Sequence, residues 1–250
     1  MIHAAIAQPS SHRAPSKARL AAELPRGAWT LLTLPSHWSR LKQAPRGDGR
    51  PVMLIPGLFD NDAAMGLMRR YLTGLGYTVR GWGLGRNIGA RATGSDAELL
   101  VEQVAAFHDE TDEPVTLVGV SLGGIMARLV AHRRPDLVRE VVTVSSPFAG
   151  DPRATNVWRA FEWLTGEKID DQSVVARRLT LAERPPVPAT AIWSASDGLV
   201  NGAICHAEGE PSIEIRASHM GVHIHPQALR AIAETLAGGA DRQSVGRLPS

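Results

Sequence analysis

Two hydrophobic patterns alternate along the chain between residues 51 and 237. Short, nearly continuous apolar runs, closed by glycine, proline or serine, are typical of strands buried on both faces of a parallel sheet. Between them, apolar residues recur at the spacing of one helix face. We expect strands over 51–57, 77–82, 114–120, 137–148, 187–196 and 211–218, and helices over 61–76, 95–110, 122–135 and 226–237. This alternation predicts the α/β class: a mostly parallel sheet of about six strands with helices on both faces.

The helix expected over 95–110 carries a start signal. Ser95 is followed three residues later by Glu98, which is the spacing of a capping box. We therefore expect Ser95 to be the N-cap residue of this helix.

The segment 149–188 interrupts the alternation. It contains VWRAFEWL (157–164) and VVARRLTLAE (174–183), both of which have the pattern of short amphipathic helices. Because the segment follows one strand and precedes the next, we expect a small helical cap inserted over the strand ends. The alternative is a pair of ordinary peripheral helices.

The two ends of the chain are less regular. Residues 28–41, AWTLLTLPSHWSRL, are apolar but interrupted by Pro35, and predict a short helix that covers the core. Peripheral contact with a lipid surface through Trp29 and Trp38 is the alternative, which the thin basic face disfavours. We expect residues 1–40 to be a partly mobile N-terminal extension, 41–240 the main domain with its cap, and 241–250 a flexible tail.

Composition limits the classes of function. The chain has 250 residues, 44% hydrophobic and 21% charged, which suits one globular domain with a large core. The formal net charge is +2 and the arginines are scattered, so a nucleic-acid partner is not expected. A single cysteine, Cys205, excludes an internal disulfide and suits a reducing compartment. No apolar run is long enough for a transmembrane segment or forms a secretory signal, so we expect a cytoplasmic protein.

Candidate chemistry centres on Ser121. Residues 119–123, GVSLG, match the pattern G-x-S-x-G between an expected strand and an expected helix. A serine on such a sharp turn projects its hydroxyl from the sheet, and small residues are needed where strand and helix nearly touch. The helix N-terminus also directs free N–H groups at any anion formed there. The pattern and its setting together favour a nucleophile.

A serine hydroxyl needs a general base and an orienting carboxylate. Two later strands end in suitable residues, Asp197 in SASDGLV and His219 in SHMGV. The loops after parallel strands meet at one edge of a sheet, so these side chains are expected near Ser121. The order Ser121, Asp197, His219 is also the order typical of this architecture.

Alternatives to these two residues remain. Glu208 and Glu214 are weaker candidates for the acid, and His223 is the second candidate for the base. His206 and His225 extend the histidine cluster and raise the alternative of a metal site. Because no cysteine or carboxylate lies at ligand spacing within the cluster, we expect no metal.

At this point the chain resembles the α/β-hydrolase family, in particular its compact bacterial lipase and esterase branch. The resemblance covers about residues 51–237 and is carried by LIPGLFDND, GVSLGG, SSPFAG, SASDGLV and SHMGVHIHP. It implies that Ser121 is the nucleophile, Asp197 the acid and His219 the base. It further implies an oxyanion hole formed by the backbone N–H groups of Leu58 and Leu122. The chain departs from many lipases by having Pro56 where they carry histidine, and the early antiparallel strands of full-size members are not recognisable.

The glycine-rich stretch GWGLGRNIG (81–89) follows the second expected strand. It lacks the third glycine of a dinucleotide-binding G-x-G-x-x-G, so that function is excluded. A substrate pocket lined by Phe59, Trp82, Arg86 and Asn87 is the alternative to structural packing. The apolar side chains expected to form an acyl site are Phe59, Met65, Trp158 and Trp163.

These observations predict a serine hydrolase that cleaves carboxylic esters, an esterase or lipase, without a cofactor. The substrate expected is a small-molecule acyl ester. The same three residues also serve acyltransferases and thioesterases, which are the nearest alternatives among enzymes. A non-catalytic binding protein of the same fold is the alternative from another class.

Overall fold

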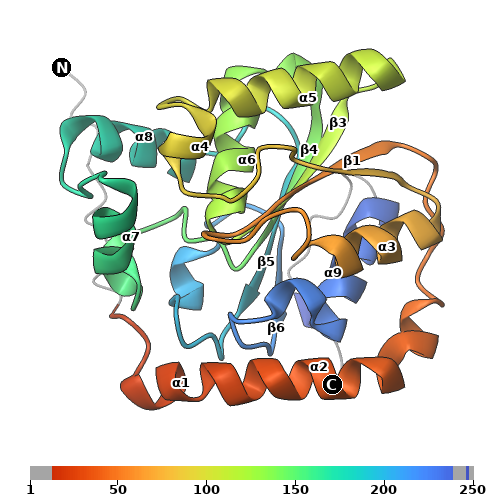
Figure 1. Ribbon diagram of the computed structural model, residues 1–250, viewed down its shortest axis with the longest axis horizontal. Coiled ribbons are helices and arrows are strands. Elements are labelled where there is room, and N and C mark those ends of the chain that lie inside the picture. Colours follow the sequence, from red (N-terminus) through yellow and green to blue (C-terminus); the bar gives the residue numbers. More distant parts are fainter. Residues whose placement is uncertain (1–12, 239–245, 248–250) are drawn as a thin grey trace.

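The computed structural model describes residues 13–238 and 246–247. Within them, seven parallel strands form a single sheet in the order β2-β1-β3-β4-β5-β6-β7 (Figure 1). The strands are β1 Pro51–Ile55, β2 Thr78–Gly81, β3 Val115–Val120, β4 Val138–Val144, β5 Ala189–Ser194, β6 Ser212–Ile215 and β7 Gly246–Arg247. The six expected strands are confirmed. The two-residue β7, which pairs with β6, was not expected.

Helices cover both faces of the sheet, which explains the continuous apolar runs of the central strands. On one face, Val52 and Leu54 of β1 pack in a core with α2 (Glu23–Leu41), α3 (Gly66–Leu75) and α9 (Pro226–Gly238). On the other, Met53 and Ile55 pack with α5 (Glu98–Thr111) and α6 (Leu122–Arg133). Short α4 (Ala90–Thr93) and one-turn 3₁₀ helices fill connections between these elements; two of the latter are η3 (Gly202–Ile204) and η4 (Val222–Ile224).

The expected capping box at the start of α5 is wrong. The helix begins at Glu98, and its N-cap is Ala97, held at a φ of 60° with no side-chain capping bond. Ser95 instead donates to the Glu98 carboxylate at 3.4 Å, which also accepts from the Asp96 amide at 3.1 Å. The left-handed turn at Ala97 directs Ser95 away from the first helical amides.

The N-terminal segment forms two helices, α1 (Lys17–Ala21) and α2, and α2 continues through Pro35 (Figure 1). Pro35 removes one backbone hydrogen bond, but Leu34 and Leu41 lie in the core and stabilise the helix on either side. The two tryptophans, nine residues apart, lie on opposite faces. Trp38 packs on the core, 6.0 Å from the Tyr71 ring, whereas Trp29 is 67% exposed.

The segment between β4 and β5 forms two helices, α7 (Trp158–Thr165) and α8 (Gln172–Ala182), at one end of the molecule (Figure 1). Buried Arg128 of α6 holds the end of α8 in place. Its guanidinium donates to the carbonyls of Leu181 at 2.8 Å and Glu183 at 2.6 Å, and pairs with Glu210.

Of the two segments expected to be mobile, 1–40 and 241–250, residues 1–12, 241–245 and 248–250 lie outside those described. The described parts include helices α1 and α2 and strand β7. None of the helices in the described ranges is long and apolar enough to cross a membrane.

Candidate active site

Ser121 lies on the turn between β3 and α6 and is strained. Its φ is 52° and its ψ −119°, a region that non-glycine residues rarely adopt. The turn is held by two backbone bonds, from the Ser121 amide to Val144 at 2.8 Å and from the Gly124 amide to Ser121 at 3.0 Å. Two more of the described non-glycine residues with positive φ, Phe59 and Ser145, follow the neighbouring strands β1 and β4. Strain clustered at one sheet edge is typical of functional sites.

The two motif glycines are required by close packing. A Cβ at Gly119 would overlap the Gly123 carbonyl, and a Cβ at Gly123 would overlap the carbonyl oxygen of Ile55. Any side chain here would push α6 away from β1 and β3, moving the turn that carries Ser121.

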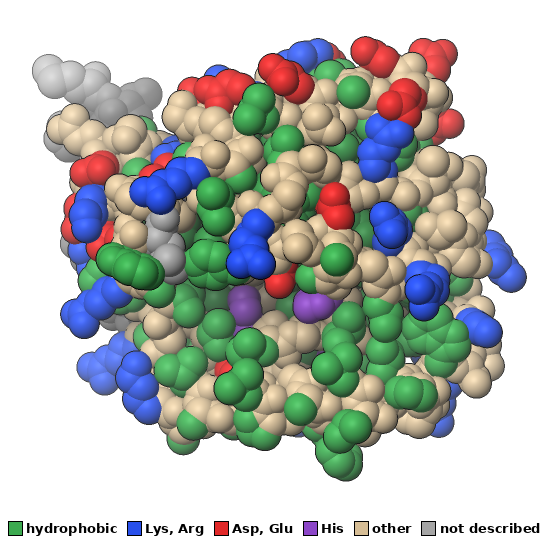
Figure 2. Space-filling model, in the orientation of Figure 1, with side chains coloured by type: hydrophobic (Ala, Val, Ile, Leu, Met, Phe, Trp, Pro, Cys, Tyr) green, Lys and Arg blue, Asp and Glu red, His purple; other side chains and the backbone are tan. Residues whose placement is uncertain are grey.

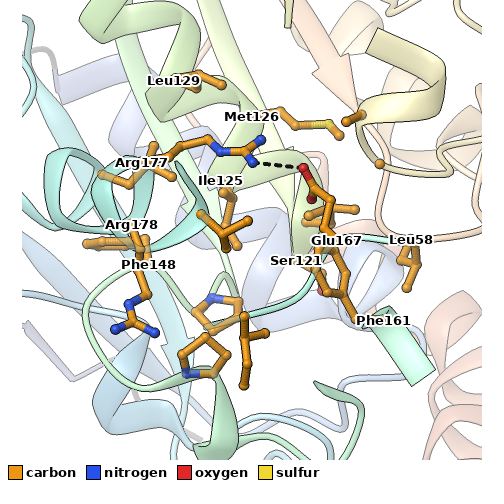
Figure 3. A pocket seen from close by; sticks show the side chains of 18 of the residues that line it. Leu58, Ser121, Ile125, Met126, Leu129, Phe148, Phe161, Glu167, Arg177 and Arg178 are labelled. Carbon is orange, nitrogen blue, oxygen red and sulfur yellow. Dashed lines mark hydrogen bonds and ion pairs between the residues drawn. The ribbon is translucent and has the colours of Figure 1, made fainter. Parts of the chain in front are cut away.

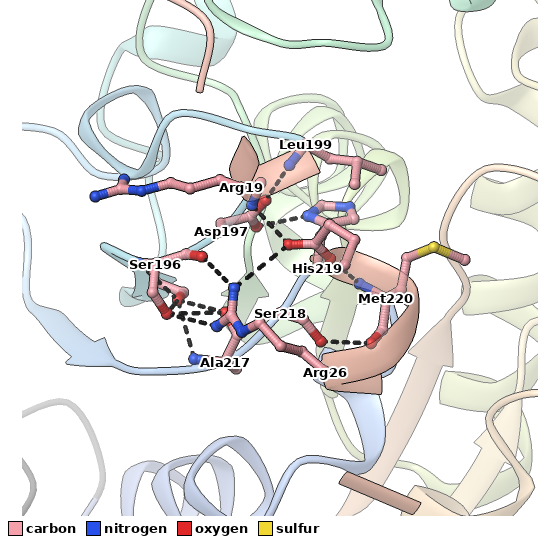
Figure 4. A network of polar contacts seen from close by, with 12 residues as sticks. Arg19, Arg26, Ser196, Asp197, Leu199, Ala217, Ser218, His219 and Met220 are labelled. Carbon is pink, nitrogen blue, oxygen red and sulfur yellow. Dashed lines mark hydrogen bonds and ion pairs between the residues drawn. The ribbon is translucent and has the colours of Figure 1, made fainter. Parts of the chain in front are cut away.

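The loops after β5 and β6 bring Asp197 and His219 to this serine. His219 Nε2 lies 3.0 Å from Ser121 Oγ. On the other side of the ring, His219 Nδ1 lies 2.7 Å from Asp197 Oδ2 (Figure 4). The other carboxylate oxygen of Asp197 accepts from the amides of Leu199 and Val200, both at 2.8 Å. A carboxylate acceptor at Nδ1 places the imidazole proton there, so that Nε2 accepts the proton of the serine hydroxyl.

The charged groups around His219 make its protonated form more stable than that of a histidine in water. Burial alone disfavours the imidazolium, but the charge and hydrogen bond of Asp197, with smaller contributions from Glu23 and Asp60, outweigh it. The pKa of His219 therefore lies above its usual value of 6.5. The arrangement stabilises positive charge on the imidazole while it holds a proton from Ser121.

Leu58 and Leu122 lie beside Ser121, and all three line the same cavity. Leu122 is the first residue of α6, where a backbone N–H has no intrahelical partner. In the described part of the chain, no hydrogen bond engages the Leu58 amide. Buried Asn87 holds the Leu58 loop. Its side-chain amide donates to the backbone carbonyl of Pro56 at 2.7 Å, and its backbone carbonyl accepts from the Phe59 amide at 2.8 Å.

An apolar cavity of about 180 Å³ adjoins Ser121 (Figure 3). Its walls come from α6, the connection around α4, and the two helices between β4 and β5. They include Ile125, Met126, Leu129, Phe148, Trp158 and Phe161. An ion pair between Glu167 and Arg177, 2.7 Å apart, also belongs to its lining (Figure 3). In the space-filling view, histidines lie in a hollow surrounded by apolar side chains (Figure 2).

Of the residues expected to form an acyl site, Trp158 lines the cavity and the others lie elsewhere. Trp82 is buried in the core beneath α5, with its indole bonded to Gly85 O, and Met65 is buried in the core on the opposite face. Arg86 is exposed. Asn87 supports the Leu58 loop, as described above. Exposed Phe59 and Trp163 lie outside the cavity lining. Trp82, Arg86 and Asn87 therefore do not line this cavity, although Gly89, at the end of the same glycine-rich stretch, does.

His219 is the histidine bonded to Ser121 Oγ, and the other candidate acids and bases lie in different surroundings. His206 stacks on Trp193 with ring centroids 4.5 Å apart, and the His225 ring accepts from the Gln227 amide. Burial lowers the pKa of His223 and brings that of His225 to about 4. Glu208 is exposed and Glu214 lies within β6. Among the described residues, no group of three or more His, Cys, Asp or Glu is placed to hold a metal ion.

A doubly covered parallel sheet with a strained serine on the turn after a central strand defines the class as α/β-hydrolase. The model of the serine aminopeptidase, S33, family matches residues 49–204, more than half of the chain, and the chain belongs to this α/β-hydrolase family. No curated protein sequence matches it significantly.

Solved structures share the fold at low sequence identity. A monoacylglycerol lipase of Paleococcus ferrophilus is 19% identical, with a TM-score of 0.53 over 78% of this chain and 96% of that one. The pyrethroid hydrolase PytH is 18% identical, with a TM-score of 0.55 over 77% and 99%. A thioesterase domain from the curacin biosynthetic pathway is 15% identical, with a TM-score of 0.53 over 79% and 92%.

Proposed function

We propose that this protein is a serine hydrolase that cleaves small carboxylic esters through an acyl-enzyme on Ser121. The observation that carries the proposal is the continuous chain of hydrogen bonds from Ser121 through His219 to Asp197, at 3.0 and 2.7 Å. Hydroxyl, imidazole and carboxylate in this order make a serine nucleophilic near neutral pH.

In the proposed reaction, Ser121 Oγ attacks the ester carbonyl carbon while its proton passes to His219 Nε2. The carbonyl oxygen becomes an oxyanion that accepts from the amides of Leu58 and Leu122, each worth about 3 kcal/mol in the transition state. The intermediate collapses, the ester C–O bond breaks, and His219 gives its proton to the departing alcohol. Water then attacks the acyl-enzyme with the same proton transfers, releasing the acid and free Ser121.

The cavity beside Ser121 supports an apolar acyl group. Its volume of about 180 Å³ and its apolar walls suit an acyl chain of limited length. Acyl transfer to an alcohol, or hydrolysis of a thioester, would use the same residues. The solved structures that share the fold include one named as a monoacylglycerol lipase and one named as a thioesterase domain.

A series of p-nitrophenyl esters from two to twelve acyl carbons tests the proposal, with an aminoacyl p-nitroanilide as the amide comparison. We expect kcat/KM to be highest at intermediate chain length, with the Ser121→Ala variant slower by roughly 10⁶-fold. Added alcohol distinguishes acyl transfer, which would yield a new ester, from hydrolysis. A wild-type protein that cleaves none of these esters, or a Ser121→Ala variant that retains its activity, would contradict the proposal.

The outer face of α2 supports a second proposal, that the protein contacts lipid surfaces. Its large apolar side chains are exposed to solvent, as on the lipid-facing side of an interfacial helix, and exposed basic residues lie at both ends of the α1–α2 segment. The apolar set is Leu24, Trp29, Leu31 and Leu32, and the basic set Lys17, Arg19, Arg40 and Lys42. The same ester series, offered as micelles, should show a rate increase that a Leu31→Ser/Leu32→Ser variant loses. Equal micelle rates for the two proteins would count against lipid contact.

A further inference from the structure

Helix α2 lies outside the residues matched by the family model, yet its first turn touches the active-site loops. Glu23, its first residue, is 1% exposed. Its carboxylate accepts from the Gly198 amide at 2.6 Å and from the Met220 amide at 2.9 Å. Gly198 follows Asp197 directly and Met220 follows His219, so one carboxylate joins the two loops.

We propose that Glu23 is a positioning residue, which fixes the loops of Asp197 and His219 relative to each other so that both reach Ser121. This inference rests on the proposed function. Other links between the two loops are the Asp197–His219 contact itself and hydrogen bonds of the Ser194 and Ser196 hydroxyls with the backbone of Ala217. The two hydrogen bonds of Glu23, called the clamp below, add a link directly beside Asp197 and directly beside His219.

Close packing at two glycines supports the same interpretation. A Cβ at Gly198 would overlap the backbone of Arg19, and a Cβ at Gly27 would lie 2.6 Å from the carbonyl oxygen of Met220. The N-terminal helices thus contact the Asp197 loop and the His219 loop through backbone atoms. Contacts this close couple the position of the Asp197 loop to α1 and that of the His219 loop to α2.

Further side chains of the same helices hold the Asp197 loop from outside. The guanidinium of Arg26 donates to the carbonyl of Ser196 at 2.6 Å and to its hydroxyl at 2.8 Å (Figure 4). Arg19 donates to Ala195 O at 3.1 Å. Arg26 also lies 3.8 Å from Glu23, which compensates part of the charge of that buried carboxylate.

Two consequences follow for catalysis. Hydrogen bonds to a charged acceptor are stronger than neutral ones, so loss of this clamp should loosen both loops, and displacement of a catalytic group by about 1 Å costs up to roughly 100-fold in rate. The charge of Glu23 also favours the imidazolium of His219, together with Asp197 and Asp60, and His219 in turn contributes to the lowered pKa of His223. Removing the charge should lower the pKa of His219.

The test compares Glu23→Gln with the matched control Glu140→Gln. Glu140 is also a buried carboxylate, but it pairs with Arg50 near the start of β4, away from the active-site loops. Glu23→Gln keeps the side-chain length but leaves only one acceptor oxygen for two amides. Glu23→Asp, a third variant, keeps the charge but shortens the reach.

In the full-length protein, we expect Glu23→Gln to lower kcat by about 10- to 100-fold with KM nearly unchanged. It should also move the acid limb of kcat/KM to lower pH. Glu23→Asp should lose kcat with a smaller shift of the limb, and Glu140→Gln should change only thermal stability. Amide hydrogen exchange should accelerate at Gly198 and Met220 in both Glu23 variants and not in the control.

Unchanged kcat, pH profile and amide exchange in Glu23→Gln would overturn the proposal, as would the same changes in Glu140→Gln. If Glu23→Gln does not fold, Glu23→Asp carries the same comparison of kcat and exchange. If the wild-type protein shows no esterase activity, the proposed function fails, but the exchange rates and an NMR titration of His219 still decide the role of Glu23.

Discussion

At the scale of single residues, the site depends on the charges around one imidazole. His219 is buried, which alone would lower its pKa, but Asp197 lies 2.7 Å from Nδ1 and reverses the direction. A general base must be neutral to accept a proton. A raised pKa therefore means that the base is lost earlier as the pH falls.

The pH dependence of kcat/KM tests this balance. We expect an acid limb with its midpoint above 6.5, the ordinary pKa of histidine. In the Asp197→Asn variant, burial dominates, so the midpoint should fall below this value while kcat drops by about 10⁴-fold. Rates measured between about pH 4.5 and 9 suffice. A wild-type midpoint below 6.5, or one that Asp197→Asn leaves in place, would contradict the electrostatic account.

At the residue scale, the position of a side chain could be predicted where a motif fixes the backbone, and not where the sequence offers only a glycine-rich loop. Ser121, Asp197 and His219 each follow a strand, so chain order and the expected sheet topology predicted that they lie close together. The structure places them within hydrogen-bonding distance. Trp82 follows β2 in the same way, but a glycine-rich loop does not determine where its side chains point, and this indole packs into the core. One feature of the sequence indicates a special role for Glu23: at helical spacing it shares a face with Gly27, Thr30 and Leu34, and this face is buried. A carboxylate on an otherwise uncharged buried face needs a specific partner.

At the scale of elements, the contact of α6 with β1 and β3 determines where the nucleophile lies. The apolar runs made these strands easy to predict, because a strand buried on both faces contains few polar residues. The element boundaries were less predictable. The start of α5 depends on the left-handed conformation of Ala97, which a short-range sequence signal does not reveal. The path of α2 through Pro35 depends on packing of residues distant in sequence.

Two glycine-to-alanine substitutions in helices distinguish the effect of a steric overlap on stability from the effect of helix propensity. Gly123→Ala places a methyl group against the Ile55 carbonyl, so we expect a loss of about 1–3 kcal/mol in the free energy of unfolding and a large loss of esterase activity. Gly66→Ala, in α3, meets no atom within 4 Å and should be neutral or stabilising by up to about 1 kcal/mol. Denaturant unfolding and ester hydrolysis measure both. Equal effects of the two substitutions would show that contact between α6 and β1 is unimportant.

At the scale of the whole molecule, segments from opposite parts of the chain surround one edge of the sheet. The loops after β1, β3, β5 and β6 supply the polar groups, the helices between β4 and β5 contribute to the apolar cavity, and α2 supports two of the loops from outside (Figure 1). The alternation of strands and helices predicted this edge as the site, because loops at the carboxyl ends of parallel strands converge. The contribution of α2 could not be predicted, because it depends on how the helix docks on the completed domain.

Covalent labelling with a fluorophosphonate tests the central claim most directly, because phosphonylation requires a nucleophile activated by the neighbouring base. Intact-mass and peptide mass spectrometry of the native protein should show one adduct, on Ser121. Labelling should be lost in denatured protein and slowed by at least about 10³-fold in His219→Ala. Native protein that acquires no adduct, or His219→Ala that reacts as fast as wild type, would show that Ser121, His219 and Asp197 do not work as a catalytic unit.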